Sequence, residues 1–219
     1  SFGTELGNVK NTVNAAAGGT AMRYAISEFN VQTAGNFDNI TDTLDTPSQF
    51  SRFGSILAQL ANNKPDELYV FKFSQGPGDG PTGVKKNGTH FVDNNNSPYN
   101  IGGSTAGGEV VRLFAKGFAG SNDLFTAPTR SGTGATDLRM AAARDTANSK
   151  YYLFSANEGT STRSLTINLT GWGIAPGARA IVEEVSSDRH GEVSQITTVP
   201  TNGILDLSQP AQSVFLVSV

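Results

Sequence analysis

The chain has 219 residues, which suffices for one large domain or two small ones with a buried core. It contains no cysteine, so disulfide bonds, thiolate metal sites and cysteine nucleophiles are excluded. Sixteen basic residues against 19 acidic ones leave a net charge of -3 with no dense basic run, which argues against nucleic acid or an anionic membrane surface as the main partner.

The first half, to about residue 120, alternates helical and strand patterns, as parallel α/β structures do. The expected elements are a helix over 4–17, a strand over 22–27, a helix capped by Ser48 and ended by 62–65, a strand over 67–73 and a helix over 105–118. The second strand is a nearly continuous apolar run, which predicts a strand covered on both faces. Two strands cannot close a parallel sheet alone, so this half looks like a piece of something larger.

From about Leu124 the pattern changes to short strands separated by turns, which indicates an antiparallel sandwich. The expected strands are 138–143, 151–156, 164–169, 179–185, 191–198 and 213–219. This places the division between domains at 1–123 and 124–219. Trp172 is interpreted as a packing residue at the sandwich edge, with sugar stacking as the alternative.

Glu28 is the sharpest candidate for catalysis, because it sits where the first predicted strand ends. In (β/α)8 barrels, catalytic groups lie at the carboxyl ends of the strands. A carboxylate there can act as nucleophile or as acid/base in glycoside hydrolysis. The alternative is an exposed loop glutamate that caps the turn, and spacing alone leaves both interpretations open.

Residues 74–104 form a long loop after the second strand, and loops of this length are usually functional or disordered. The loop should lie on the same face as Glu28 and carries Asn87, His90 and Tyr99. Amides, an imidazole and aromatic rings suit a neutral sugar. A purely structural or disordered Asn/Gly loop is the alternative. His90 has no second His or Cys at usable spacing, so we expect no metal site.

Four first-half segments and the closing strands together carry a family resemblance. The segments are Tyr24–Asn30, Glu67–Phe73, Lys85–Phe91, Tyr99–Gly103, Ala180–Val185 and Gln209–Val217. Across nearly the whole chain they resemble glycoside hydrolase family 86, the β-agarases and β-porphyranases of marine and gut bacteria.

The resemblance implies the last strands and helices of a (β/α)8 TIM barrel followed by an antiparallel β-sandwich. Residues 22–28 would be the seventh barrel strand and 67–73 the eighth. Glu28 then matches the nucleophile of retaining enzymes, with Asn30, Asn87, His90 and Tyr99 as substrate-binding residues. The acid/base would be a glutamate after the fourth strand, outside this chain. Retaining hydrolysis needs both carboxyl groups about 5–5.5 Å apart, so the chain alone should be almost inactive.

The implied function is endo-acting hydrolysis of β-linked galactans, agarose or porphyran, of red-algal cell walls. The expected partners are the galactan and the N-terminal portion of the same enzyme, with no cofactor and no nucleic acid. A non-catalytic carbohydrate-binding or scaffold sandwich is the alternative. We interpret Ser1 as a processed terminus or a cut within a longer protein. No apolar run reaches the roughly 18 residues of a membrane span, and the resemblance implies a secreted or cell-surface, or periplasmic, bacterial protein.

Overall fold

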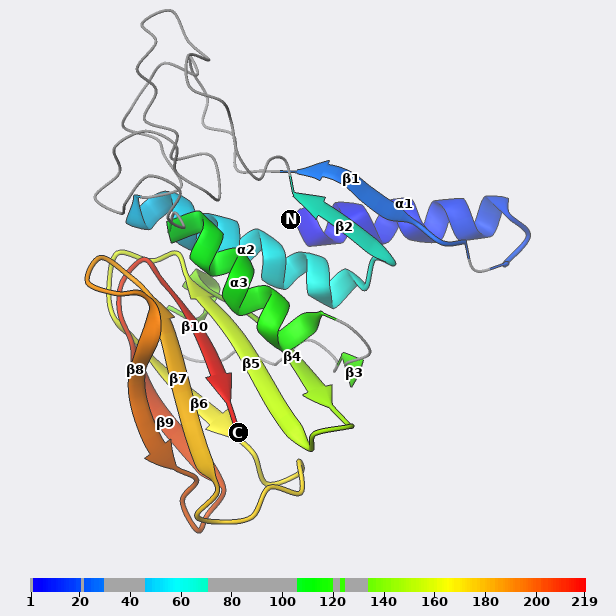
Figure 1. Ribbon diagram of the computed structural model, residues 1–219. Helices are drawn as coiled ribbons and strands as arrows, with labels where there is room; N and C mark the ends of the chain where they lie inside the picture. Colours follow the sequence, from blue (N-terminus) through cyan, green and yellow to red (C-terminus); the bar gives the residue numbers. More distant parts are fainter. Residues whose placement is uncertain (1, 21, 30–45, 71–105, 120–122, 125–133) are drawn as a thin grey trace, which may run out of the picture.

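The computed structural model describes residues 2–20, 22–29, 46–70, 106–119, 123–124 and 134–219 (Figure 1). Its first elements are α1 (Phe2–Ala16), β1 (Ala25–Phe29), α2 (Pro47–Asn63), β2 (Glu67–Val70) and α3 (Ala106–Phe118). The predicted alternation of helix and strand is therefore present, and β1 and β2 pair in parallel. Mixed α/β structure and, further along the chain, antiparallel sheets are both observed.

Among the boundaries in this half that differ from the expectation, those of α2 and β1 concern residues that the sequence analysis singled out. Helix α2 begins at Pro47 with Thr46 at its N-cap, so Ser48 lies inside the helix instead of capping it. Proline is favoured in the first helical turn, because its fixed φ suits the helix and its missing N–H has no partner there anyway. Strand β1 starts three residues later than expected and runs through Glu28 to Phe29, so Glu28 belongs to the strand itself.

The remaining elements are nearly all strands. They are β3 (Asp123–Leu124), the 3₁₀ turn η1 (Ala135–Asp137), β4 (Leu138–Asp145), β5 (Lys150–Asn157), β6 (Arg163–Asn168), β7 (Arg179–Val185), β8 (His190–Thr198), β9 (Ile204–Gln209) and β10 (Ser213–Ser218). Six of them form an antiparallel sheet in the order β3-β4-β5-β10-β7-β8, and β6 pairs with β9 in a second sheet. Strand β9 was not anticipated, although Leu205, Leu207 and Gln209 alternate as its buried positions.

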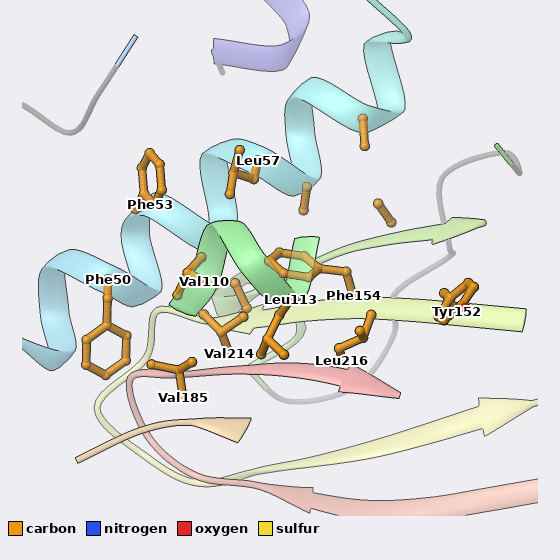
Figure 2. Packing of buried hydrophobic residues seen from close by; sticks show 14 of the residues in the cluster. Phe50, Phe53, Leu57, Val110, Leu113, Tyr152, Phe154, Val185, Val214 and Leu216 are labelled. Atoms are coloured by element: carbon orange, nitrogen blue, oxygen red, sulfur yellow. The ribbon is translucent and has the colours of Figure 1, made fainter. Parts of the chain in front are cut away.

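One face of the six-stranded sheet is covered by α2 and α3, which lie between this sheet and the β1–β2 pair (Figure 1). Figure 2 shows the side chains that meet there. Helix α2 contributes Phe50, Phe53 and Leu57, and α3 contributes Val110 and Leu113. These pack against residues of β5, β7 and β10, namely Tyr152, Phe154, Val185, Val214 and Leu216. The apolar residues Phe50, Phe53 and Leu57 thus lie on the buried face of α2.

The other face of the same sheet packs against β6 and β9. Phe215 and Val217 of β10 point into this second core, whereas their neighbours Val214 and Leu216 belong to the first. Side chains alternate across a strand, so a strand buried on both faces needs a continuous apolar run, which β10 has. Helices of the first half and strands of the second therefore share one core. The division at 123/124 stays a prediction, and β3 spans it.

Gly54 lies where α2 packs closely against β5 and β10. A Cβ built on Gly54 would lie 2.7 Å from Cγ2 of Val214 and 3.3 Å from Cβ of Ala156. Real Cβ atoms essentially never come as near as 2.7 Å, and the neighbour is a short β-branched side chain that cannot swing away. The absence of a side chain at Gly54 therefore sets the distance between α2 and β10.

Replacing Gly54 with alanine should lower the free energy of unfolding by roughly 1–3 kcal/mol, because the added methyl overpacks the core. Urea unfolding followed by circular dichroism measures this change. Gly7→Ala in α1 is the matched control, since its Cβ meets only the side-chain oxygen of Asn63 at 3.3 Å. Adding Val214→Ala should recover part of the loss in a double-mutant cycle. Additive losses at the two positions would contradict the close contact.

A cluster of charges joins α3 to β7 and β8. The Glu183 carboxylate on β7 is 8 % exposed and accepts hydrogen bonds from Lys116 and, at 3.4 Å, from Nη1 of Arg112. Arg112 also donates to Glu109 at 2.5 Å and to the backbone carbonyl of Gly191 at 2.6 Å. The two cations are about half exposed, with side-chain exposures of 45 % each. The buried partner is therefore the carboxylate.

Removing both cations should cost more stability than removing the carboxylate. In Arg112→Met/Lys116→Met the buried Glu183 loses its counter-charges, and we expect a loss of about 1–3 kcal/mol. Glu183→Gln leaves two cations that can turn into water, so its loss should be smaller. Urea unfolding of both variants at neutral pH gives the comparison. A larger loss for Glu183→Gln would show that the carboxylate is not the costly member of the cluster.

Candidate active site at the strand ends

The candidate site lies at the carboxyl ends of β1 and β2. The two strands are parallel, with Ala25 opposite Glu67, Ile26 opposite Leu68 and Phe29 opposite Val70. Helix α2 connects them, so they form a β-α-β unit. Both strands consequently end at the same edge of the pair. This is the edge at which α/β folds assemble their binding and catalytic residues.

The register of the pair changes directly at Glu28. Three residues separate Ile26 from Phe29 on β1, but only two separate their partners Leu68 and Val70 on β2. Ser27 and Glu28 together therefore stand opposite the single residue Tyr69, which is the arrangement of a β-bulge. Bulges are concentrated next to active sites, where the extra residue changes the direction in which a side chain leaves the strand. Glu28 thus occupies an irregular backbone position near the end of its strand.

Polar contacts hold the amino ends of the two strands together. The backbone N–H of Tyr24 donates to the Asp66 carboxylate at 2.8 Å, and the N–H of Asp66 donates back to the carbonyl of Tyr24 at 3.0 Å. Lys10 of α1 donates to the carbonyl of Lys64 at 3.0 Å, and its Nζ lies 4.8 Å from the centroid of the Tyr24 ring. Burial raises the pKa of Tyr24, and Asp66 adds to the shift.

A second set of contacts lies on the strands themselves. Arg23 pairs with Glu67 at 2.7 Å, and the phenol of Tyr69 donates to the other carboxylate oxygen of Glu67 at 2.8 Å. This hydrogen bond is the largest cause of the raised pKa of Tyr69. Sequence reasoning did not single out these residues. The contact between Glu67 and Tyr69 could have been expected from the sequence, because residues at i and i+2 of a strand place their side chains on the same face.

Of the site residues predicted from the sequence, the structure places the backbone of Glu28 within β1. Asn30, Asn87, His90 and Tyr99 lie outside the described residues, so their role in binding stays a prediction. Within the described ranges, no group of three or more His, Asp or Glu residues could hold a metal ion. No helix in those ranges is both long enough and apolar enough to cross a membrane.

Trp172 lies beside an apolar hollow that residues of both antiparallel sheets line. Its ring is tilted against that of Tyr151, with centroids 5.3 Å apart, and the Tyr151 hydroxyl donates to the Trp172 carbonyl. The hollow is lined by Tyr151, Leu153, Ile167, Leu169, Trp172, Leu205, Val217 and Val219. Trp172 is partly buried against the second core, which favours packing over sugar stacking.

Comparisons by sequence find no relative: no family model matches the chain, and no curated protein matches it. Comparison of the fold finds several solved structures. A family 30 endoxylanase from Clostridium papyrosolvens C71 superposes with a TM-score of 0.65 and 15 % identity, over 97 % of this chain and 45 % of the enzyme. A glucosidase from Croceicoccus marinus superposes with a TM-score of 0.64 and 12 % identity, over 99 % of this chain and 49 % of the glucosidase. A conserved exported protein from Bacteroides fragilis superposes with a TM-score of 0.63 and 14 % identity, over 99 % of this chain and 43 % of that protein.

The chain spans less than half the length of each of these proteins. The fold neighbours include TIM-barrel glycoside hydrolases, and the match is to part of the barrel. At identities of 12–15 %, these comparisons show a shared fold and nothing further about function. The resemblance to family 86 is therefore supported at the level of the glycoside hydrolase fold, and the particular family is a matter for proposal.

Proposed function

We propose that this chain is the C-terminal part of a retaining, endo-acting glycoside hydrolase that cleaves β-linked galactans of red-algal cell walls, agarose or porphyran. Polysaccharide degradation is supported by fold neighbours that include an endoxylanase and a glucosidase. The choice of a galactan as the proposed substrate rests on the sequence resemblance to family 86. A secreted or cell-surface location is part of the proposal, and the likeness to an exported protein is in keeping with it.

The observation that carries the proposal is the position of Glu28. It lies near the carboxyl end of a parallel strand, at a break in register, in a chain whose fold matches glycoside hydrolases. Catalytic carboxylates of (β/α)8 enzymes are found at the carboxyl ends of strands. In the proposed assembly β1 is the seventh barrel strand and β2 the eighth.

The proposed reaction follows the two-step course of retaining enzymes. The Glu28 carboxylate attacks the anomeric carbon, and the glycosidic C–O bond breaks as an acid/base glutamate protonates the leaving oxygen. The covalent glycosyl-enzyme is then hydrolysed by water, which the same glutamate deprotonates. That glutamate belongs to the N-terminal portion of the enzyme, so neither step can run on this chain alone.

Substrate recognition is assigned to Asn30, Asn87, His90 and Tyr99, which follow β1 and β2 in the sequence. Amide and imidazole groups can donate to sugar hydroxyls, and an aromatic ring can stack on the C–H face of a sugar. This composition suits a neutral sugar better than a strongly anionic one. The alternative function, a non-catalytic carbohydrate-binding module, would use the antiparallel sheets. Trp172, the aromatic residue considered for that alternative, packs against Tyr151 and the second core.

Glu28→Gln should abolish hydrolysis in the assembled enzyme, because the amide keeps the shape of the side chain but cannot act as a nucleophile. We expect kcat on agarose or porphyran to fall by roughly a thousandfold or more, while polysaccharide binding is retained. Reducing-sugar release measures turnover, and affinity electrophoresis in the same polysaccharides measures binding.

Glu192→Gln on the exposed strand β8 is the matched control and should keep turnover within about twofold. Unchanged turnover in Glu28→Gln would remove this residue from the mechanism. Turnover of xylan or β-glucan with none on either galactan would keep the hydrolase and overturn the galactan assignment.

A further inference from the structure

Three polar side chains stand together on the strand pair, away from the helical core. Leu68 packs against that core, and side-chain alternation puts Tyr69 on the opposite face of β2, where it is 54 % exposed. The side chains of Arg23 and Glu67, which contact each other beside it, are 77 % and 42 % exposed. Parallel sheets are normally covered on both faces. Among the described residues, the predicted two-sided burial of this strand is therefore met only on the Leu68 side.

Tyr69 is the residue of β2 that stands beside Glu28. Ser27 and Glu28 are opposite Tyr69 in the register of the pair, and Phe29 is already opposite Val70. Neighbouring strands lie about 4.8 Å apart, so the backbone of Tyr69 adjoins that of the proposed nucleophile. Both strands point the same way (Figure 1), and (β/α)8 enzymes assemble catalytic residues from the carboxyl ends of several strands. Tyr69 thus has the place of a residue in the same site.

The hydrogen bonds of Tyr69 leave its phenol with one function unused. The phenol donates its single proton to Oε2 of Glu67 at 2.8 Å, and Oε1 of Glu67 accepts from Nη2 of Arg23 at 2.7 Å. A phenol oxygen also carries acceptor lone pairs, and no donor among the described residues reaches them. Tyr69 can therefore accept a further hydrogen bond but cannot donate one while Glu67 holds its proton.

Glu67 makes the phenol oxygen a better acceptor. A hydrogen bond to a carboxylate is charge-assisted, and hydrogen bonds in a row polarise one another, so electron density on the phenol oxygen increases. The same hydrogen bond is the first cause of the raised pKa of Tyr69, so the phenol stays protonated at neutral pH. The result is an oriented, neutral oxygen that is open to a donor from outside the chain.

We propose that Tyr69 is a substrate-contact residue of the hydrolase: its phenol oxygen accepts a hydrogen bond from a hydroxyl of the sugar bound next to Glu28, while Glu67 and Arg23 hold the phenol in position. Ligand sites use a few placed polar groups of this kind to fix orientation. A sulfate ester or a methyl ether has no proton to donate, so the sugar position contacted must carry a free hydroxyl. The inference rests on the proposed function and adds to it a residue that orients the substrate.

The test is Tyr69→Phe in the assembled enzyme, because phenylalanine keeps the ring and removes only the hydroxyl. We expect kcat/KM on agarose or porphyran to fall about tenfold, as for the loss of one hydrogen bond, with the melting temperature unchanged. Tyr24→Phe is the matched control, since Tyr24 lies at the amino ends of the same two strands. It should leave kcat/KM within about twofold.

Glu67→Gln separates the orientation of the phenol from a merely structural role. The amide can donate to the phenol oxygen and occupy its lone pairs, so kcat/KM should fall severalfold. The same change in the Tyr69→Phe background should cost nothing further. The inference is overturned by turnover of Tyr69→Phe within twofold of wild type, by an equal fall in Tyr24→Phe, by a fall that comes with a lowered melting temperature, or by equal losses from Glu67→Gln in both backgrounds.

Failure of this contact and failure of the proposed function give different results. If Glu28→Gln abolishes turnover and Tyr69→Phe does not change it, the function stands and the contact is overturned. If the assembled enzyme hydrolyses neither galactan, the function fails, and calorimetric titration with a neutral agaro-oligosaccharide tests the contact by itself. A Kd about tenfold weaker in Tyr69→Phe then supports the contact, whereas equal affinity, or no binding to the wild type, overturns it.

Discussion

Burial of the six-stranded sheet on both faces is the constraint on which the rest of the structure depends. Strand β10 shows it most directly: Val214 and Leu216 pack under α2 and α3, while Phe215 and Val217 pack against the β6–β9 sheet. Each face removes apolar surface from water, and this is the dominant favourable term in folding. Neither the helices nor the small sheet would have a core without the sheet between them.

The candidate site depends on this remote packing. Glu28 lies on β1, β1 is paired with β2, and Leu68 of β2 packs against the core that α2 and α3 share with the sheet. Gly54 sets how closely α2 approaches β10, and Glu183 ties α3 to β7. A catalytic group must be held by rigid neighbours. The antiparallel sheets therefore support the candidate site indirectly, because they hold the helices on which β2 packs.

The fold is shared with glycoside hydrolases at only 12–15 % identity because packing constrains the sequence loosely. A packed core requires apolar residues of suitable size at the buried positions, and many different sequences meet that requirement. Substrate choice is different, because it rests on a few polar groups placed by loops. The comparison therefore shows a shared fold, whereas the galactan that we propose as substrate rests on the sequence resemblance to family 86.

The sequence by itself determined the elements whose patterns are local. Strand β7 was predicted with its observed bounds, and helices were predicted where α2 and α3 lie. Strand β9 was missed, although Leu205, Leu207 and Gln209 alternate as its buried positions in the pattern of a half-buried strand. Only the tertiary structure showed the register break at Glu28 and the pairing of Glu183 with Lys116, 67 positions apart. Both are relations between distant segments, which no local periodicity records.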